Sequence, residues 1–164
     1  MIEAAVFDLD ETLIHLPLDY DKLFQAFSRI MKTKNVRPLT KTVSKLNEKS
    51  KREVFTVWDK AELAALGRIT PIEEGIALYK NLSNKPRALV TMQGRALVNR
   101  ILERFNLTFD VILTREDCLD RVKQLKTAAQ TLGVHLENVL FVGNGESDKL
   151  AAQEVGCQFL KVKK

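Results

Sequence analysis

The sequence predicts an α/β fold in which helices cover a parallel β-sheet and an all-helical segment is inserted after the first strand. Short apolar segments that fit strands alternate with amphipathic helical segments from about residue 79 to the C-terminus. The segment 16–70 shows helical periodicity throughout. One strand segment, 139–142, is apolar at every position, which is typical of a sheet covered on both faces.

The first half of the sequence contains the first strand and the inserted helices. An apolar segment at about residues 2–8 predicts the strand. Apolar residues then recur at helical spacing after Asp19 and Asp21, either of which is a candidate N-cap. A weaker helical pattern covers about 40–49, and a stronger one follows it and ends at Gly67.

The second half alternates helices and strands. Thr70, Pro71 and Glu73 predict the start of the next helix, with Thr70 as N-cap, Pro71 at the first helical position and Glu73 completing a capping box. The segments that follow predict strands at 87–91, 111–113, 139–142 and 157–162, separated by helices at 97–105, 122–132 and 147–155. This order fits parallel strands joined by right-handed crossovers.

Length and composition limit the class of protein. A chain of 164 residues with 45% apolar and 29% charged residues fits one compact globular domain with an insertion. No apolar run approaches the ~18 residues of a membrane span, and acidic residues interrupt the N-terminus where a signal peptide would be apolar. Cys118 and Cys157 lack a CxxC partner. We therefore expect a cytoplasmic protein with reduced thiols and no membrane partner, and the sequence predicts no particular oligomeric state.

The net charge of +5 is unevenly distributed. Residues 29–52 contain nine lysines and arginines and one acid, Glu48, so this segment alone carries +8. The first interpretation is a solvated helical face, and the alternatives are attraction of an anionic ligand to a cleft or contact with nucleic-acid phosphates. No aromatic residue lies between Phe27 and Phe55. Because single-stranded nucleic acid is bound by stacking on aromatic side chains, a nucleic-acid partner is not favoured.

Two carboxylates follow the first strand. Asp8 and Asp10 lie two residues apart, and residues i and i+2 of a strand point the same way. Ligands of open α/β sheets bind at the carboxyl end of the strands. A pair of carboxylates at that position costs repulsion and desolvation unless a cation or a shared proton joins them.

Further polar residues follow the other predicted strands. Thr91 ends the second strand, and Asn144, Glu146 and Asp148 follow the fourth. Lys123 lies at the start of the helix before the fourth strand. Because the carboxyl ends of parallel strands share one edge of the sheet, these side chains are expected to converge with the two carboxylates.

The order of these residues resembles the haloacid dehalogenase-like (HAD) hydrolase superfamily over essentially the whole chain. The segment 8–12, Asp-Leu-Asp-Glu-Thr, is similar to the DxDxT signature of that superfamily. Thr91 is similar to the Thr or Ser of its second motif, and 143–148, Gly-Asn-Gly-Glu-Ser-Asp, to its GDxxxD fourth motif. The resemblance implies a Rossmann-like doubly wound parallel sheet in the order 3-2-1-4-5, with a core domain at 1–15 and 79–164 and an inserted helical cap subdomain at 16–78.

The resemblance also implies an activity, that of a phosphatase acting on a small phosphorylated metabolite. Asp8 would attack phosphorus and form an aspartyl-phosphate, which divides one difficult displacement into two easier ones. Asp10 would protonate the leaving alkoxide and then accept a proton from the hydrolytic water. Thr91 and Lys123 would hold the phosphoryl oxygens.

The metal implied by the resemblance is Mg²⁺, which prefers octahedral oxygen ligands. Its ligands would be Asp8, the backbone carbonyl of Asp10, Asn144 and Asp148. The fourth motif of the superfamily normally opens with Asp where this chain has Asn144. An amide oxygen still binds Mg²⁺, but one negative charge is lost, and metal affinity is expected to fall unless Glu146 or Asp148 compensates.

The cation for the phosphoryl group is the second departure from the superfamily pattern. Members often carry this lysine in a Lys-Pro stretch, whereas here Arg121, Lys123 and Lys126 precede Gly133 and none of the three is followed by Pro. Lys123 is the preferred candidate and Arg121 the next, because Lys126 lies deeper in the helix.

Two alternatives to the phosphatase stay open. A phosphomutase would pass the same phosphoryl group to a sugar hydroxyl instead of water. A catalytically weakened phosphate- or partner-binding protein would explain Asn144 and the basic segment. A dehalogenase is less favoured, because that chemistry uses neither Mg²⁺ nor a leaving-group acid at Asp10.

Overall fold

A computed structural model describes residues 1–163 and contains a central five-stranded parallel sheet. The strands of this sheet are β1 (Ala4–Phe7), β4 (Arg87–Val90), β5 (Val111–Leu113), β6 (Val139–Gly143) and β7 (Gln158–Lys161). Their spatial order is β5-β4-β1-β6-β7, with all neighbours parallel. Counted within this sheet, the order is 3-2-1-4-5, and the predicted doubly wound α/β fold is confirmed.

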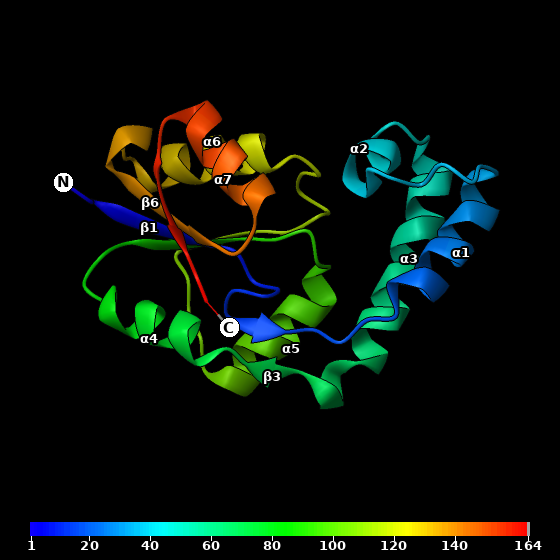
Figure 1. Cartoon of the computed structure of the whole chain (residues 1–164), viewed down its shortest axis with the longest axis horizontal. Coiled ribbons are helices and arrows are strands. Elements are labelled where there is room, and N and C mark those ends of the chain that lie inside the picture. Colours follow the sequence, from blue (N-terminus) through cyan, green and yellow to red (C-terminus); the bar gives the residue numbers. More distant parts are fainter. Residues whose placement is uncertain (164) are drawn as a thin grey trace.

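Helices cover both faces of the sheet (Figure 1). Helices α4 (Glu73–Asn81) and α5 (Arg95–Phe105) lie on one face, and α6 (Arg121–Leu132) and α7 (Glu146–Val155) lie on the other. Ala5 and Phe7 of β1 pack in the cluster that includes α4 and α5, whereas Val6 packs with α6 and α7. The alternation of side chains along a strand therefore divides the buried residues of β1 between two apolar layers.

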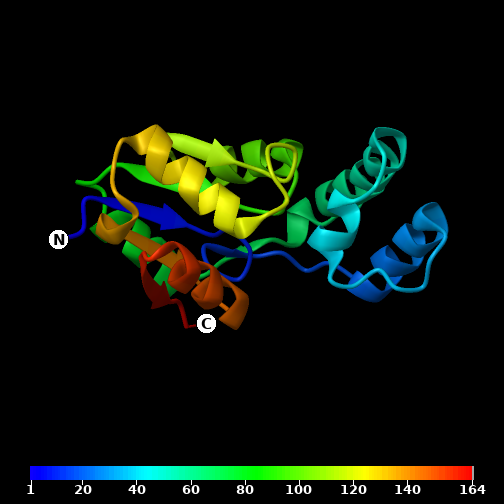
Figure 2. The same ribbon diagram turned by 90° about the horizontal axis from the view of Figure 1, so that it is seen from above.

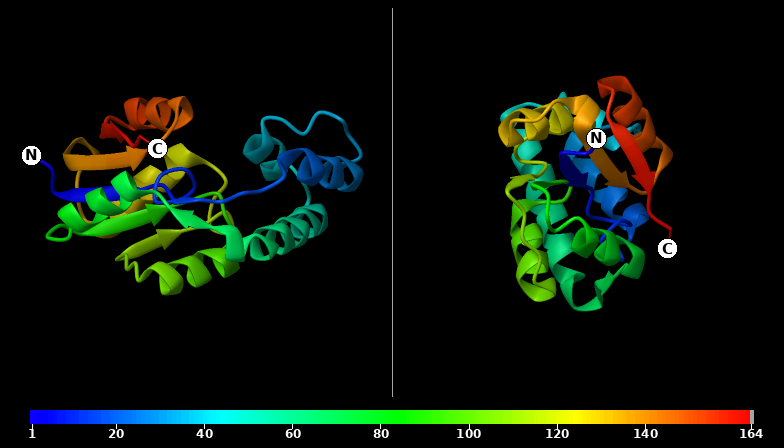
Figure 3. Two further views of the ribbon diagram at one scale, coloured as in Figure 1. Left: turned by 60° about the horizontal axis from the view of Figure 1, so that its bottom comes forward. Right: turned by 90° about the vertical axis from the view of Figure 1, so that its left-hand side faces the viewer.

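Three further helices extend beyond the carboxyl ends of the strands (Figures 2 and 3). They are α1 (Tyr20–Met31), α2 (Leu39–Ser44) and α3 (Glu48–Ala64), and we call them the α1–α3 layer. Asp19 caps α1 by accepting a hydrogen bond from the backbone of Lys22, as one of the two predicted caps. The layer has its own apolar cluster, in which the Phe27 and Trp58 rings meet edge to face at 5.5 Å.

A two-stranded antiparallel ribbon lies where the chain enters and leaves the α1–α3 layer. It pairs β2 (Ile14–His15) with β3 (Thr70–Pro71). The predicted capping box at Thr70 is therefore wrong, because Thr70 and Pro71 are extended and paired, and α4 begins at Glu73 after Ile72 without a side-chain cap. Ile72, between β3 and α4, is held by the backbone of the segment before β2, since its N–H donates to Leu13 O at 2.9 Å.

The division into a core domain (1–15 and 79–164) and a cap subdomain (16–78) stays a prediction. Helix α4 runs through position 78, and its residues Ile76 and Tyr79 pack in the same apolar cluster as Phe7 of the sheet. These contacts group α4 with the sheet layers, so we would place the boundary of the insertion at the β2–β3 ribbon.

A buried ion cluster joins the α1–α3 layer to the rest of the molecule. The guanidinium of Arg115, which follows β5, donates to Asp59 and, at 2.9 Å, to Glu62, both on α3. The other oxygen of Glu62 accepts the backbone N–H of Gly94 at 3.0 Å. A Cβ at position 94 would lie 2.2 Å from the Asp59 carboxylate, so only glycine fits there. We call these four residues the Arg115 cluster.

Two features of composition have structural counterparts. Cys118 and Cys157 are both free and half-buried. Among residues 1–163, no helix is both long enough and apolar enough to cross a membrane.

Candidate functional site

Asp8 lies at the carboxyl end of β1, in the middle of the sheet, and is 6% exposed. One of its carboxylate oxygens accepts a hydrogen bond from the Thr12 hydroxyl at 3.2 Å, and the other accepts one from Arg121 Nη2 at 2.9 Å. The chain turns sharply after Asp8, because Leu9 O accepts the N–H groups of Thr12 and Leu13. This turn brings the Thr12 hydroxyl back to the carboxylate four residues earlier.

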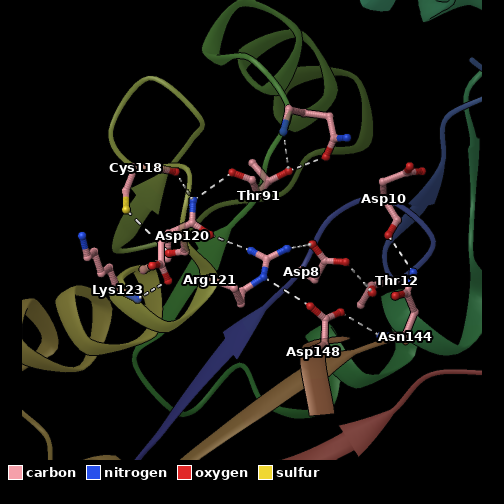
Figure 4. Close-up of polar contacts among 12 residues, drawn as sticks. Asp8, Asp10, Thr12, Thr91, Cys118, Asp120, Arg121, Lys123, Asn144 and Asp148 are labelled. Carbon is pink, nitrogen blue, oxygen red and sulfur yellow. Dashed lines mark hydrogen bonds and ion pairs between the residues drawn. The ribbon is translucent and has the colours of Figure 1, made fainter. Parts of the chain in front are cut away.

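Asp10 directs its carboxylate away from Asp8 (Figure 4). Its Oδ1 accepts the backbone N–H of Leu16 at 3.0 Å, whereas its backbone carbonyl accepts the side-chain N–H of Asn144 at 3.0 Å. Tyr20, at the start of α1, hydrogen-bonds to Asp10, and the pKa of its phenol is raised, first by burial and then by the negative charges of Asp10 and Glu62. Asp10 therefore contacts groups from both the sheet edge and the α1–α3 layer.

Asp148 comes to the same place from the other side, in the first turn of α7 after β6. Its Oδ1 accepts a hydrogen bond from Arg121 Nε at 3.2 Å, and its Oδ2 accepts the backbone N–H of Asn144 at 3.3 Å. A Cβ on Gly143 would lie 2.7 Å from Asp148 Oδ2, so the glycine that ends β6 allows this approach. The carboxylates of residues 8 and 148 thus share one guanidinium, as Figure 4 shows.

The cation between the two carboxylates is Arg121, and Lys123 does not lie there. Lys123 is exposed, and Figure 4 shows its side chain directed away from Asp8. The reason is the start of α6: Asp120 caps the helix by accepting the Lys123 N–H at 3.2 Å, and Arg121 is the first helical residue. Two residues along a helix correspond to a rotation of about 200°, which places Lys123 on another face from Arg121. Lys126 is exposed as well.

Thr91 directly follows β4, the neighbour of β1, and is fully buried. Its hydroxyl donates to Gln93 Oε1 at 2.5 Å and accepts the Gln93 N–H at 3.1 Å. Its carbonyl accepts a hydrogen bond from Gln124 Nε2 at 3.0 Å, and Gln124 Oε1 in turn accepts Arg121 Nη1 at 2.7 Å. Gln124 therefore connects the residue after β4 to Arg121 through two hydrogen bonds.

Gln93 and Gln124 are site residues that the sequence reasoning missed. Gln124 is fully buried on a helix face that also carries Leu125 and Ala128. A polar residue on an otherwise apolar face, three positions after a candidate arginine, is a detectable signal, because residues i and i+3 of a helix are neighbours. Glu146, another predicted participant, is exposed and forms no ion pair within residues 1–163.

The electrostatics of the site make Asp8 easier to protonate than an ordinary aspartate, because its pKa is raised. The pKa of Asp8 is raised to about 7, chiefly because burial disfavours the charged form, with a further rise caused by the charges of Asp148 and Asp10. Arg121 opposes this rise. With both carboxylates ionised, the two acids and one guanidinium give the Arg121 cluster, defined as Asp8, Arg121 and Asp148, a net charge of −1.

The oxygens around Asp8 form a donor set that suits Mg²⁺. The carboxylates of Asp8 and Asp148, the carbonyl of Asp10 and the side-chain oxygen of Asn144 are all hard ligands. The amide nitrogen of Asn144 now faces the Asp10 carbonyl, so its oxygen turns to a cation only when that hydrogen bond breaks. Among residues 1–163, no group of three or more His, Cys, Asp or Glu side chains is arranged to hold a metal. The residues fit a magnesium site of low charge.

The chain is similar to known proteins over nearly its whole length. The family model described as haloacid dehalogenase-like hydrolase matches residues 5–162. The phosphoglycolate phosphatase of Neisseria meningitidis is 26% identical over 187 aligned positions, which cover 95% of this chain and 78% of that protein.

Two solved structures share the fold. A haloacid dehalogenase-like hydrolase of Streptococcus pneumoniae superimposes with a TM-score of 0.71 at 21% identity, covering 99% of this chain and 85% of that one. CbbY of Rhodobacter sphaeroides, solved in complex with phosphate, gives a TM-score of 0.70 at 16% identity, covering 100% of this chain and 87% of that one. Because the family model matches residues 5–162 of its 164 residues, the chain belongs to the haloacid dehalogenase-like hydrolases.

Proposed function

We propose that the protein is a Mg²⁺-dependent phosphatase that hydrolyses a small phosphorylated metabolite through an aspartyl-phosphate on Asp8. The observation that carries the proposal is the meeting of Asp8, from β1, and Asp148, after β6, at one guanidinium on the carboxyl edge of the sheet. The similarity to a phosphoglycolate phosphatase supports the reaction class.

Asp8 is the proposed nucleophile because it is buried, fixed by Thr12 and Arg121, and central in the sheet. Its carboxylate oxygen forms a bond to phosphorus while the bond from phosphorus to the leaving oxygen breaks. Asp10 gives a proton to that oxygen, and in the second half it takes a proton from the water that attacks phosphorus and releases Asp8 and phosphate. For both steps the Asp10 carboxylate turns from Leu16 N toward the reacting atoms.

Arg121 and Thr91 are the proposed holders of the phosphoryl group. The guanidinium of Arg121 already contacts the nucleophile and presents planar donors that match phosphate oxygens in pairs. Arg121 takes the place for which Lys123 was predicted. The Thr91 hydroxyl is held by Gln93 and donates to a phosphoryl oxygen once it rotates away from that side chain. Both groups stabilise the charge that develops in the transition state.

Mg²⁺, when bound, would neutralise charge on the phosphoryl oxygens and favour the ionised form of Asp8. The residues that would hold it are Asp8, the carbonyl of Asp10, Asn144 and Asp148. Asn144 contributes no charge, and the guanidinium of Arg121 lies next to two of the other ligands. We therefore expect weaker metal binding than an aspartate at position 144 would give.

The test is hydrolysis of p-nitrophenyl phosphate in millimolar Mg²⁺, followed by a screen of phosphorylated metabolites that begins with phosphoglycolate. Asp8→Asn should abolish turnover, whereas Asp21→Asn, an exposed residue of α1, should not. Acid-quenched wild-type protein should carry one phosphoryl group on the peptide that contains Asp8. Turnover that persists in Asp8→Asn contradicts the mechanism.

A second candidate function is a phosphate-binding protein with little or no turnover. The amide at position 144 and its hydrogen bond to the Asp10 carbonyl favour it. Absence of hydrolysis at high Mg²⁺, together with measurable binding of inorganic phosphate, would establish this alternative.

A further inference from the structure

A groove borders the Arg121 cluster on the side of the α1–α3 layer. It has a volume of about 1020 Å³ and lies between α2, the N-terminal part of α6 and the length of α7, and Arg121, Asp148 and Met92 line it. The upper end of the range for small-molecule sites is roughly 1,000 Å³. A leaving group of two carbon atoms would fill only part of this volume.

The charged groups of the groove differ in whether they already have partners. Asp120 accepts the Lys123 N–H as the cap of α6, and Asp148 is bound to Arg121. Lys123 and Lys41 also line the groove, are exposed, and form no ion pair within residues 1–163. The two ammonium groups are therefore available to a ligand.

One further carboxylate lines the groove. Glu154 lies six residues after Asp148, about 9 Å along α7 at 1.5 Å per residue. Lys123 is only two residues from Arg121, on the first turn of α6. Along the helix axes, Lys123 therefore lies closer to the Arg121 cluster than Glu154 does.

The walls between these charges are largely apolar. Pro38 comes from the α2 side, and Leu119, Val122, Leu150 and Ala151 come from the core side. Leu150 is 56% exposed although it is a large apolar residue. A ligand with a short hydrocarbon segment would cover this surface.

We propose that this groove binds the leaving group of the substrate, and that Lys41 and Lys123 bind an anionic group, a carboxylate or a second phosphate, carried by that leaving group. The inference rests on the proposed function for its phosphate end. It assigns Lys123, which is too far round the helix to serve Asp8, to the recognition of the remainder of the substrate. It also gives Lys41, one member of the basic segment 29–52, a defined ligand.

Binding of non-hydrolysable ligands tests the proposal independently of turnover. The probes are four-carbon alkyl phosphonates that end in a carboxylate, a second phosphonate or a hydroxyl group, titrated calorimetrically into the whole protein at low salt. We expect the two anionic probes to bind about tenfold more tightly than the hydroxyl probe. Each of Lys41→Gln and Lys123→Gln should reduce that preference about three- to fivefold, as expected for exposed ion pairs. The two anionic arms distinguish a carboxylate from a second phosphate.

Matched controls lie on the same elements. Lys126→Gln on α6 and Lys45→Gln at the end of α2 remove exposed lysines that do not line the groove, and both should retain the preference. Equal affinity of wild-type protein for all three probes, or no detectable binding of any probe at millimolar concentration, overturns the proposal. So does a preference that survives both groove substitutions. If the preference follows the two lysines but no phosphate ester is hydrolysed, the proposed function fails and the groove assignment stands.

Discussion

Two arginines of this protein each hold a pair of carboxylates, and their surroundings differ in instructive ways. Arg115 is bound by Asp59 and Glu62 of one helix, and its side chain is completely buried. Arg121 is bound by Asp8 and Asp148, which follow two different strands, and its side chain is 17% exposed beside a groove. Both clusters have the same formal charge.

The difference lies in what else can reach the charges. The Arg115 guanidinium also lies over the Trp58 ring, 4.2 Å from its centroid. The second carboxylate oxygen of Glu62 accepts a hydrogen bond from the backbone N–H of Gly94. Protein groups thus surround the Arg115 guanidinium, although the Asp59 side chain is 33% exposed. The Arg121 cluster, in contrast, borders a cavity and draws its members from the strand ends at which ligands of this fold class bind. We infer that the Arg115 cluster fixes the α1–α3 layer and that the Arg121 cluster performs the chemistry.

Breaking the Arg115 cluster should have the largest effect on stability. Arg115→Met leaves two buried or partly buried carboxylates without a cation, and loss of one partner of a buried ion pair costs about 3–5 kcal/mol. Urea denaturation should show this loss. Replacing Glu62 by Leu in the same chain should restore part of it, because fewer unpaired charges then remain. A variant as stable as wild type would show that the cluster does not hold the layer.

Breaking the Arg121 cluster should instead affect turnover. Arg121→Ala removes a guanidinium that contacts the nucleophile, and we expect kcat/KM for p-nitrophenyl phosphate to fall about 10²–10³-fold, as for loss of one charge-stabilising group. Arg121→Lys should recover part of this activity, because lysine keeps the positive charge. The recovery should be incomplete, because lysine lacks the planar paired donors of a guanidinium. Lys123→Ala is the matched comparison on the same helix. A larger loss from Lys123→Ala than from Arg121→Ala would reverse the assignment.

The pH dependence of stability should distinguish Asp8 from the carboxylates of the other cluster. Because the pKa of Asp8 is raised from 3.8 to about 7 in the folded protein, the folded state binds more protons than the unfolded state between those values. Its contribution to the free energy of unfolding is therefore greatest at low pH and falls as pH rises through this window. Between pH 5 and 8 the metal-free wild type should lose on the order of 2–3 kcal/mol relative to Asp8→Asn.

Thermal or urea unfolding in a chelating buffer measures this difference. Burial also raises the pKa of Glu62 and Asp59, and their contributions have the same sign. They are common to both proteins and cancel in the comparison. A difference between wild type and Asp8→Asn that does not change with pH would contradict the raised pKa.

The sequence predicted the fold well because local signals and the fold agree. The four apolar residues of 139–142 lie within β6, and Gly133 and Gly156 end α6 and α7 in the left-handed conformation, with φ of 72° and 81°. The failure at Thr70 and Pro71 has a tertiary cause. Their pairing with Ile14 and His15, more than fifty positions away in the chain, overrides a local helix-start signal.

The site was predictable in its strand-end members and less so in its helical ones. Three of these residues directly follow a strand, namely Asp8, Thr91 and Asn144, and Asp148 lies in the first turn of the helix after β6. The predicted strands therefore already placed them at one edge of the sheet. Whether Arg121 or Lys123 faces Asp8 depends on the residue at which α6 begins. The cap at Asp120 sets that residue. The Arg115 cluster was not predictable, since Asp59 and Glu62 look like solvated charges of an ordinary helix until α5 and the loop after β5 pack on them.

The Arg121 cluster should tolerate an added negative charge at position 144. Asn144→Asp removes the amide hydrogens that now contact the Asp10 carbonyl and supplies a third carboxylate near Arg121, where a divalent cation can bind it. We expect the Mg²⁺ dissociation constant, measured calorimetrically without substrate, to fall about tenfold, since the added charge is worth roughly 1.4 kcal/mol at this range. Asn138→Asp, whose side-chain amide contacts exposed Glu3, is the control and should leave it unchanged. Unchanged affinity in Asn144→Asp would show that position 144 is not a ligand. A tenfold gain would show that the Arg121 cluster accepts a metal ion beside its arginine, whereas the Arg115 guanidinium is completely buried.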